Sequence, residues 1–141
     1  MKSLFYILIL IIATISCNQN NTSSSKDASS IVQTEKEFKS LELMNFMSSY
    51  LKEKTGEAML LDVRTPPEYD SGYIKGAVLI NYLDDDIDQQ LNLMDKTKTY
   101  YIYCSQGSRG DKCMDKMKKL GFDRVFNLQG GYEAYTKATF K

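Results

Sequence analysis

Apolar residues along the chain fall into two patterns, short continuous blocks and positions repeated at helical spacing. Short blocks rich in β-branched and aromatic residues are typical of buried parallel strands. Blocks separated by helical segments predict an α/β fold, with a mainly parallel sheet of about four or five strands and helices on both faces. The predicted strands are 38–39, 58–63, 77–81, 99–103 and 124–128, and the predicted helices end near residues 52, 94, 120 and 138.

Several residues mark where the predicted helices begin and end. Ser40 is a predicted N-cap for the helix that runs to about Lys52. The prolines at 66–67 exclude a strand or helix interior and can occupy the first turn of a short helix. Acidic residues between 84 and 88 suit the start of the next helix, and we interpret them as a charged first turn rather than a metal site. Gly121 is expected to end the helix before the last strand.

The first residues form an apolar stretch that is too short to cross a bilayer. Lys2 precedes the continuous apolar run Leu4–Ala13, and Ser16 stands directly before Cys17. A membrane-spanning helix needs about 20 apolar residues, whereas an export signal needs fewer. Residues 1–16 resemble the signal peptide of bacterial lipoproteins, which implies that Cys17 is lipidated and becomes the mature N-terminus. A short uncleaved anchor and a plain secretory signal are the alternatives.

A polar segment separates this signal from the rest of the chain. Residues 17–31 contain almost no apolar side chains, so they cannot bury enough surface to offset the entropy of ordering, and we predict a flexible tether. Residues 32–141 then form one domain. Lipid on Cys17 would hold this domain at a membrane. The predicted location is the bacterial cell envelope, with the domain in the periplasm.

Composition and charge restrict the chemistry that this domain can perform. The 141 residues include no histidine and three cysteines, Cys17, Cys104 and Cys113. The lack of histidine excludes Ser–His and Cys–His catalysis, and three thiols are too few for a disulfide framework or a four-thiolate metal site. The 18 basic and 18 acidic residues give no net charge, which argues against nucleic-acid binding. Any thiol chemistry must therefore use one cysteine that is activated without an imidazole.

Cys104 is the candidate nucleophile because it follows the predicted strand 99–103 directly. Ligands bind beyond the carboxyl ends of parallel strands, and the backbone N–H groups of a loop that opens a helix can form a cradle for negative charge. Such a cradle favours the thiolate and can hold an anionic group attached to its sulfur. Gly107 lets the backbone curl, and Arg109 adds a cation; the alternative is a buried structural cysteine. The predicted binding loop consists of Ser105, Gln106, Gly107, Ser108, Arg109 and Gly110.

Five motifs, in order along the chain, resemble the rhodanese family over residues 38–137. The resemblance implies a three-layer α/β sandwich and a persulfide on Cys104, from which a sulfane sulfur passes to a nucleophile without a metal or an organic cofactor. It also implies that Asp62, Arg64 and Glu68 tie the fold together beneath the site, and we interpret Arg64 and Glu68 as an ion pair. The motifs are Leu61–Arg64 with Pro66–Tyr69, Gly72–Ala77, Cys104–Arg109, Leu120–Phe122 and Leu128–Gly131.

Sulfur transfer is the function that this resemblance favours, with thiosulfate or a similar small anion as the donor and a thiol, a protein or cyanide as the acceptor. Cys104 and Arg109 enclose four residues, one fewer than in the related phosphatases, and Tyr103 stands where those enzymes have histidine, so phosphatase activity is disfavoured. A non-catalytic partner-binding module and a thiol redox protein that also uses Cys113 are the alternatives. Cys113 lies on the apolar stripe of its predicted helix, which favours a packing role.

Overall fold

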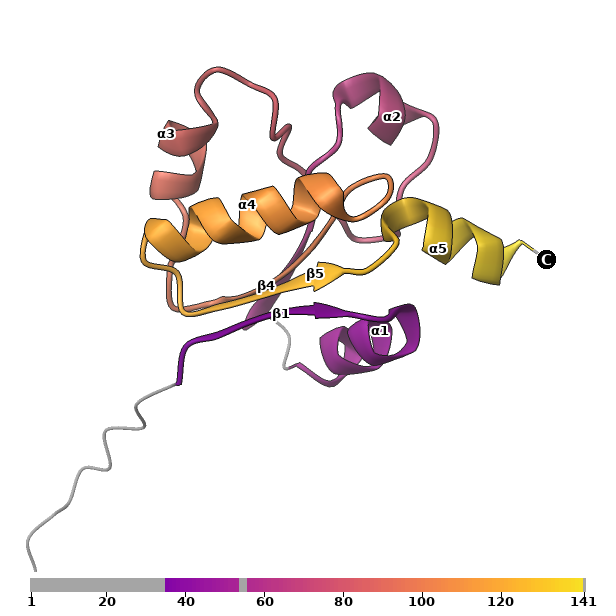
Figure 1. The fold of residues 1–141 in the computed structure, drawn as a ribbon, viewed down its shortest axis with the longest axis horizontal. Coiled ribbons are helices and arrows are strands. Elements are labelled where there is room, and N and C mark those ends of the chain that lie inside the picture. Colours follow the sequence, from indigo (N-terminus) through magenta and orange to yellow (C-terminus); the bar gives the residue numbers. More distant parts are fainter. Residues whose placement is uncertain (1–34, 54–55, 141) are drawn as a thin grey trace, which may run out of the picture. The chain divides into compact units, whose positions relative to one another are not determined.

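Five parallel strands form a single sheet in the part of the chain that the structure describes. The structure is a computed structural model, and it describes residues 35–53 and 56–140. The strand order is β1-β5-β4-β2-β3 and every pairing is parallel, which confirms the predicted α/β fold (Figure 1). The strands are β1 (Glu37–Leu41), β2 (Ala58–Asp62), β3 (Val78–Leu79), β4 (Thr99–Tyr103) and β5 (Arg124–Leu128).

Helices cover both faces of this sheet. α1 (Leu43–Lys52) and α5 (Gly131–Thr139) pack on one face, and α3 (Ile87–Asn92) and α4 (Ser108–Lys119) pack on the other (Figure 1). α2 (Pro66–Asp70) follows the carboxyl end of β2. The sheet is therefore the middle layer of a three-layer sandwich, as predicted.

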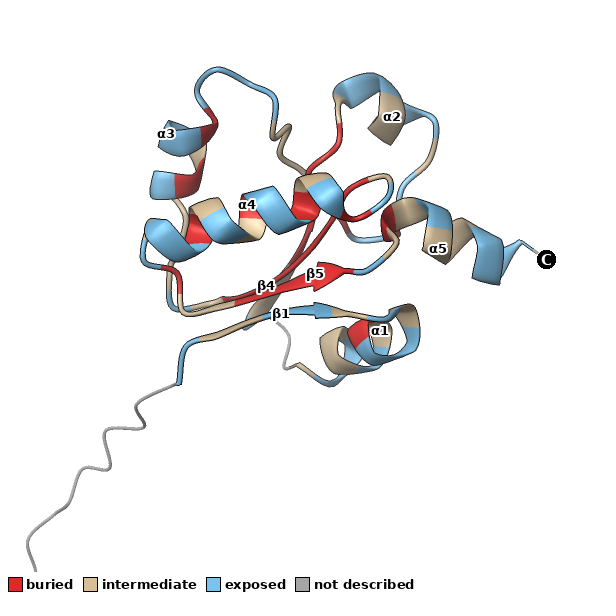
Figure 2. Ribbon diagram, viewed as in Figure 1, coloured by how far each residue is buried: buried red, intermediate tan, exposed pale blue. Residues whose placement is uncertain are grey.

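The central strands are buried because helices lie above and below them (Figure 2). All five residues of β4 are buried. Successive side chains of a strand point to opposite faces, so Ile102 packs with Cys113 and Met117 of α4, whereas Tyr101 packs with Phe46 of α1. Burial on both faces explains why β4 has a continuous block of strand-forming residues rather than an alternating pattern.

The edge strand β3 is shorter and more exposed than its apolar sequence predicts. The block 77–81 contains only a two-residue strand, Val78–Leu79, whose pairing partner is β2. Val78 is 48% exposed, because an edge strand has a neighbour on one side only. The prediction of a buried strand over 77–81 is therefore wrong in length and in burial.

Two helices begin later than the sequence predicts. Ser40 is not an N-cap, because it belongs to β1, and α1 begins at Leu43 after Glu42. Most of the acidic cluster likewise precedes its helix, since α3 begins at Ile87 with Asp86 at the cap position. For Ser40, pairing of β1 with β5 outweighs the capping preference because it satisfies backbone hydrogen bonds along the whole segment.

Other helix ends lie where they are predicted. Pro66 is the first residue of α2. Gly121, with φ +91°, follows the C-cap of α4, a position at which glycine tolerates the left-handed conformation better than other residues.

The predicted signal peptide (1–16), the lipidation residue Cys17 and the predicted tether (17–31) lie outside the described residues, as does the start of the domain predicted over 32–141. Among the helices of residues 35–53 and 56–140, none has the length and apolarity needed to cross a membrane.

Candidate active site

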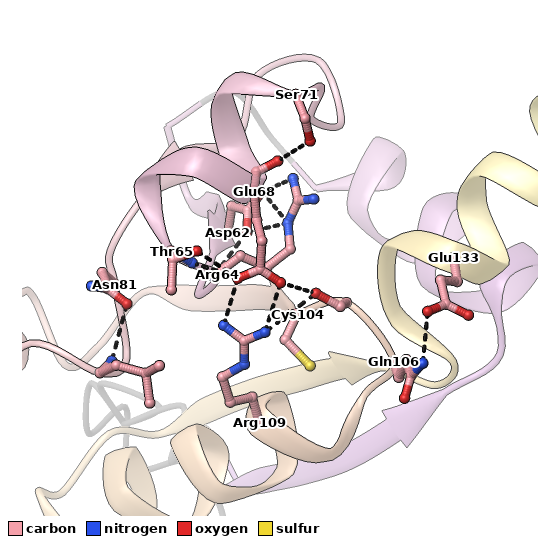
Figure 3. Close-up of polar contacts among 12 residues, drawn as sticks. Asp62, Arg64, Thr65, Glu68, Ser71, Asn81, Cys104, Gln106, Arg109 and Glu133 are labelled. Atoms are coloured by element: carbon pink, nitrogen blue, oxygen red, sulfur yellow. Dashed lines mark hydrogen bonds and ion pairs between the residues drawn. The ribbon is translucent and has the colours of Figure 1, made fainter.

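Cys104 lies where β4 ends and the loop toward α4 begins. It is 2% exposed, and its thiol is free. The strands β2 and β5 flank β4 and run parallel to it, so the segments that follow all three strands meet at the same edge of the sheet. In the close-up, Glu68 of α2 and Arg109 of α4 lie beside Cys104, with α2 and the start of α4 on either side of them (Figure 3).

The loop bends tightly around the sulfur. The backbone N–H of Gly107 donates a hydrogen bond to Cys104 Sγ at 3.1 Å. Gly107 has φ +102°, which strongly favours glycine, and a Cβ there would lie 3.2 Å from the backbone nitrogen of Gly130. α4 begins at Ser108, and the N–H groups of a helix's first turn have no partner within the helix. The thiol therefore lies where N–H groups and a helix dipole favour negative charge.

Glu68 and Arg109 form a two-point ion pair beside this loop (Figure 3). Arg109 Nη1 donates to Glu68 Oε2 at 2.9 Å, and Arg109 Nη2 donates to Glu68 Oε1 at 2.8 Å. The hydroxyl of Ser105 donates to the same carboxylate, and so do the backbone N–H and the hydroxyl of Thr65, at 2.9 and 2.7 Å. Glu68 therefore accepts from five donors, and the three from Ser105 and Arg109 connect α2 to the loop.

The contacts of this pair shift the ionisation of both partners. Hydrogen bonds from Arg109 hold the pKa of Glu68 well below its usual range, although burial acts in the opposite direction. The same hydrogen bonds raise the pKa of Arg109. Both groups are therefore charged at neutral pH, and the cation that the sequence predicts at Arg109 is paired with a carboxylate.

Asp62 and Arg64 form a second ion pair, inside the protein. Their side chains are 0% and 3% exposed, and Arg64 Nη2 lies 2.6 Å from Asp62 Oδ2. Arg64 also donates to the carbonyl oxygen of Gly72 at 2.7 Å, and its guanidinium lies over the Tyr132 ring, 4.1 Å from the centroid. Burial acts to lower the pKa of Arg64, but hydrogen bonding to Asp62 and the charge of Asp62 outweigh it and raise the pKa.

The predicted ion pair between Arg64 and Glu68 is therefore wrong. Arg64 lies two residues from Asp62 and bonds its buried carboxylate, which would be costly to leave without a cation. Glu68 instead faces the loop and binds Arg109.

Asn127, a residue that sequence reasoning misses, supports the loop from β5. It is fully buried, and its Nδ2 donates to the carbonyl oxygen of Gly107 at 3.0 Å and to Asp111 Oδ1 at 2.7 Å. A Cβ on Gly110 would lie 2.0 Å from Asn127 Oδ1, so only glycine fits at that position. The sequence signal that could have revealed this support is a polar amide within a predicted buried strand, because a buried polar group needs a hydrogen-bond partner.

The remaining candidate residues lie in different surroundings. Gln106 and Ser108 are exposed, and Gln106 Nε2 donates to Glu133 Oε1 of α5 at 2.7 Å. Cys113 is fully buried in the core beneath α4, and burial raises the pKa of its thiol to about 12. A thiol that stays protonated suits packing better than a resolving role. Across residues 35–53 and 56–140, no three His, Cys, Asp or Glu side chains are placed to hold a metal ion.

Comparison with known proteins identifies the family of this chain. The chain matches the rhodanese-like domain model over residues 47–138. It belongs to the rhodanese-like domain family. The Bacillus subtilis protein YqhL is 30% identical over 106 residues, which cover 75% of this chain and 79% of YqhL. The crystal structure of a rhodanese-like domain protein from Staphylococcus aureus matches with a TM-score of 0.60 at 33% identity, covering 69% of this chain and 90% of that structure.

A third relative is much longer than the segment that it shares with this chain. MoeZ of Mycobacterium tuberculosis, a probable adenylyltransferase/sulfurtransferase, is 36% identical over 78 residues, which cover 55% of this chain and 20% of MoeZ. The matched segment is therefore a small part of MoeZ, and the likeness concerns that part alone.

Proposed function

We propose that this rhodanese-like protein is a sulfurtransferase in which Cys104 carries a sulfane sulfur as a persulfide. The observation that carries the proposal is the 3.1 Å hydrogen bond from the Gly107 N–H to Cys104 Sγ at the start of α4. This contact puts a nearly buried thiol against an N–H donor that can stabilise negative charge, either on the thiolate or on the terminal sulfur of a persulfide. The partial likeness to MoeZ, named a probable adenylyltransferase/sulfurtransferase, supports the same chemistry.

The first step loads the protein. The Cys104 thiolate attacks the outer sulfur of thiosulfate or a similar donor. A sulfur–sulfur bond forms to Cys104, the sulfur–sulfur bond of the donor breaks, and its electron pair leaves with the sulfite fragment. The N–H groups of Gly107 and of the first turn of α4 stabilise the charge on the terminal sulfur, as an oxyanion hole does for oxygen.

The second step removes the sulfane sulfur from Cys104. A thiol of a small molecule or a protein, or cyanide in an assay, attacks the terminal sulfur, and Cys104 leaves as a thiolate. Neither step needs a metal, an organic cofactor or an external oxidant. Glu68, Ser105 and Arg109 hold the loop in shape through their mutual hydrogen bonds.

The test is thiocyanate formation from thiosulfate and cyanide by the purified protein and two variants. We expect Cys104→Ser to abolish turnover, whereas Cys113→Ser, which changes a buried thiol outside the loop, keeps most of it. Turnover that needs both cysteines would favour the thiol redox alternative. A wild-type protein that turns over no donor, and whose physiological role survives Cys104→Ser, would favour the non-catalytic binding module.

We also propose that lipid on Cys17 anchors the protein in the bacterial cell envelope, with the domain in the periplasm. The support is the sequence alone: a short apolar run, a small residue before Cys17 and a polar segment after it. In cells fed a labelled fatty acid, wild-type protein is expected to acquire the label and to stay with the membranes. Cys17→Ser should lose the label; a variant that keeps it would contradict the proposal.

A further inference from the structure

We propose that Glu68 is a specificity-determining residue, which makes the Cys104 site select hydropersulfides of thiols (R–S–SH) over the dianion thiosulfate. This inference rests on the proposed function and names the class of donor for the same site. It follows from how the charges around the loop are paired.

The loop has one cationic side chain, and that cation is already bound. Within residues 104–110 the only basic residue is Arg109. Both of its terminal nitrogens donate to Glu68, and its side chain lies beside that of Cys104 (Figure 3). Glu68 is ionised at neutral pH because these hydrogen bonds lower its pKa. The pair therefore adds no net charge beside the sulfur (Figure 3).

The other charged groups in contact with the loop do not supply a positive field. Glu133 accepts a hydrogen bond from Gln106 and lies 3.6 Å from Lys137, an exposed partner. Asp111, in the first turn of α4, accepts from the Asn127 amide and the Ser40 hydroxyl. Glu68, Glu133 and Asp111 thus face two cations, Arg109 and Lys137, so these side chains carry a slight excess of negative charge.

This distribution acts differently on the two classes of donor. Thiosulfate brings two negative charges, so the energy of its approach depends on the side-chain field about twice as strongly as that of a singly charged ion. A thiol hydropersulfide whose R group is neutral overall brings at most one. The backbone N–H groups can stabilise the single charge that develops on sulfur, but no unpaired cation of the loop is present to attract a dianion.

The loading step with a hydropersulfide balances without a further reactant. The Cys104 thiolate attacks the outer sulfur of R–S–SH, and the proton stays on that sulfur. The new bond gives Cys104–S–SH, the donor's sulfur–sulfur bond breaks, and its electron pair leaves as R–S⁻, which takes a proton from water. Sulfane sulfur moves between two thiols with no net oxidation.

The experiment measures the second-order rate constants with which thiosulfate and cysteine hydropersulfide load Cys104 of the purified protein, followed by mass spectrometry. Wild type should react faster with the hydropersulfide. Glu68→Gln leaves Arg109 without its counter-charge and should raise the thiosulfate-to-hydropersulfide rate ratio about tenfold. The matched control Glu133→Gln removes a carboxylate that is not bound to Arg109, and should change the ratio less than about threefold.

Several results separate this inference from the proposed function. If Glu68→Gln slows both donors equally, Glu68 only supports the loop and the inference is wrong. A steep fall of the wild-type thiosulfate rate with ionic strength would reveal an attractive positive field and would overturn it without any variant. If neither donor loads Cys104, the proposed function itself fails.

Discussion

The Asp62–Arg64 and Glu68–Arg109 pairs use the same chemical groups in different surroundings. The side chains of Asp62 and Arg64 are 0% and 3% exposed, whereas those of Glu68 and Arg109 are 32% and 23% exposed. Removing one partner of a buried pair leaves a charge that water cannot reach, which is costly, whereas a pair in contact with water can be changed at little cost. We infer that the first pair serves stability and that the second serves the shape and the electrostatics of the loop.

Among the variants that test this comparison, Asp62→Asn should lose the most stability. It leaves the buried guanidinium of Arg64 without a counter-charge, and we expect a loss of about 3–5 kcal/mol in the free energy of unfolding. Urea unfolding followed by circular dichroism measures this loss. The exposed Asp85→Asn is the matched control and should stay within about 0.5 kcal/mol of wild type. A loss below about 1 kcal/mol for Asp62→Asn would show that the two pairs do not differ as we infer.

Arg64→Lys should have a smaller effect, because the charge stays and the geometry changes. Lysine can still bond Asp62, but it cannot also reach the carbonyl of Gly72 and lie flat over Tyr132. We expect a loss of about 1–3 kcal/mol in urea unfolding. Arg124→Lys, in a more exposed pair with Glu53, is the control and should cost less than about 1 kcal/mol. Equal losses of unfolding free energy in the two variants would show that the buried pair contributes no more to stability than the more exposed pair.

Glu68→Gln should cost less again, about 1 kcal/mol at neutral pH, because Arg109 can be solvated when its partner loses its charge. The same urea titration measures this. If this variant is as unstable as Asp62→Asn, the Glu68–Arg109 pair is a structural element of the same kind, and the contrast fails.

The smallest effect should be the pH dependence of the stability difference between wild type and Glu68→Gln. The pKa of Glu68 in the folded protein lies below its usual value of 4.5, so its ionised form stabilises the fold above about pH 4.5. That contribution is lost as pH falls toward the folded-state pKa. The difference in unfolding free energy between wild type and Glu68→Gln should therefore begin to shrink below about pH 5 and should keep shrinking as pH falls toward the folded-state pKa. A gap that stays constant over this range would contradict the pairing of an ionised Glu68.

The fold and the loop could be predicted because their signals are local. Continuous apolar blocks predict buried strands, and Gly107 marks a backbone conformation that the loop needs. The short length and the exposure of β3 could not be predicted in this way, since the sequence of 77–81 does not indicate that this strand lies at the edge of the sheet. Ser40 shows the same limit, because its capping preference is local and its strand pairing is not.

The pairing of charges could not be predicted, because it depends on directions that only the packed fold defines. Arg64 precedes Glu68 by four residues, a spacing at which two side chains of a helix can pair. In the structure Arg64 instead bonds Asp62, and Glu68 bonds Arg109, which lies far along the chain. The contact between Asn127 and Gly110 likewise requires β5 to lie beneath the first turn of α4. A polar residue inside a buried strand is the one sign of it in the sequence.

Intact mass spectrometry of the purified protein tests the central claim most directly. After incubation with cysteine hydropersulfide or thiosulfate, we expect a gain of one sulfur atom that cyanide removes. The gain should persist in Cys113→Ser and be absent from Cys104→Ser. No adduct with either donor, or an equal adduct in Cys104→Ser, would contradict the assignment of Cys104 as the sulfur carrier.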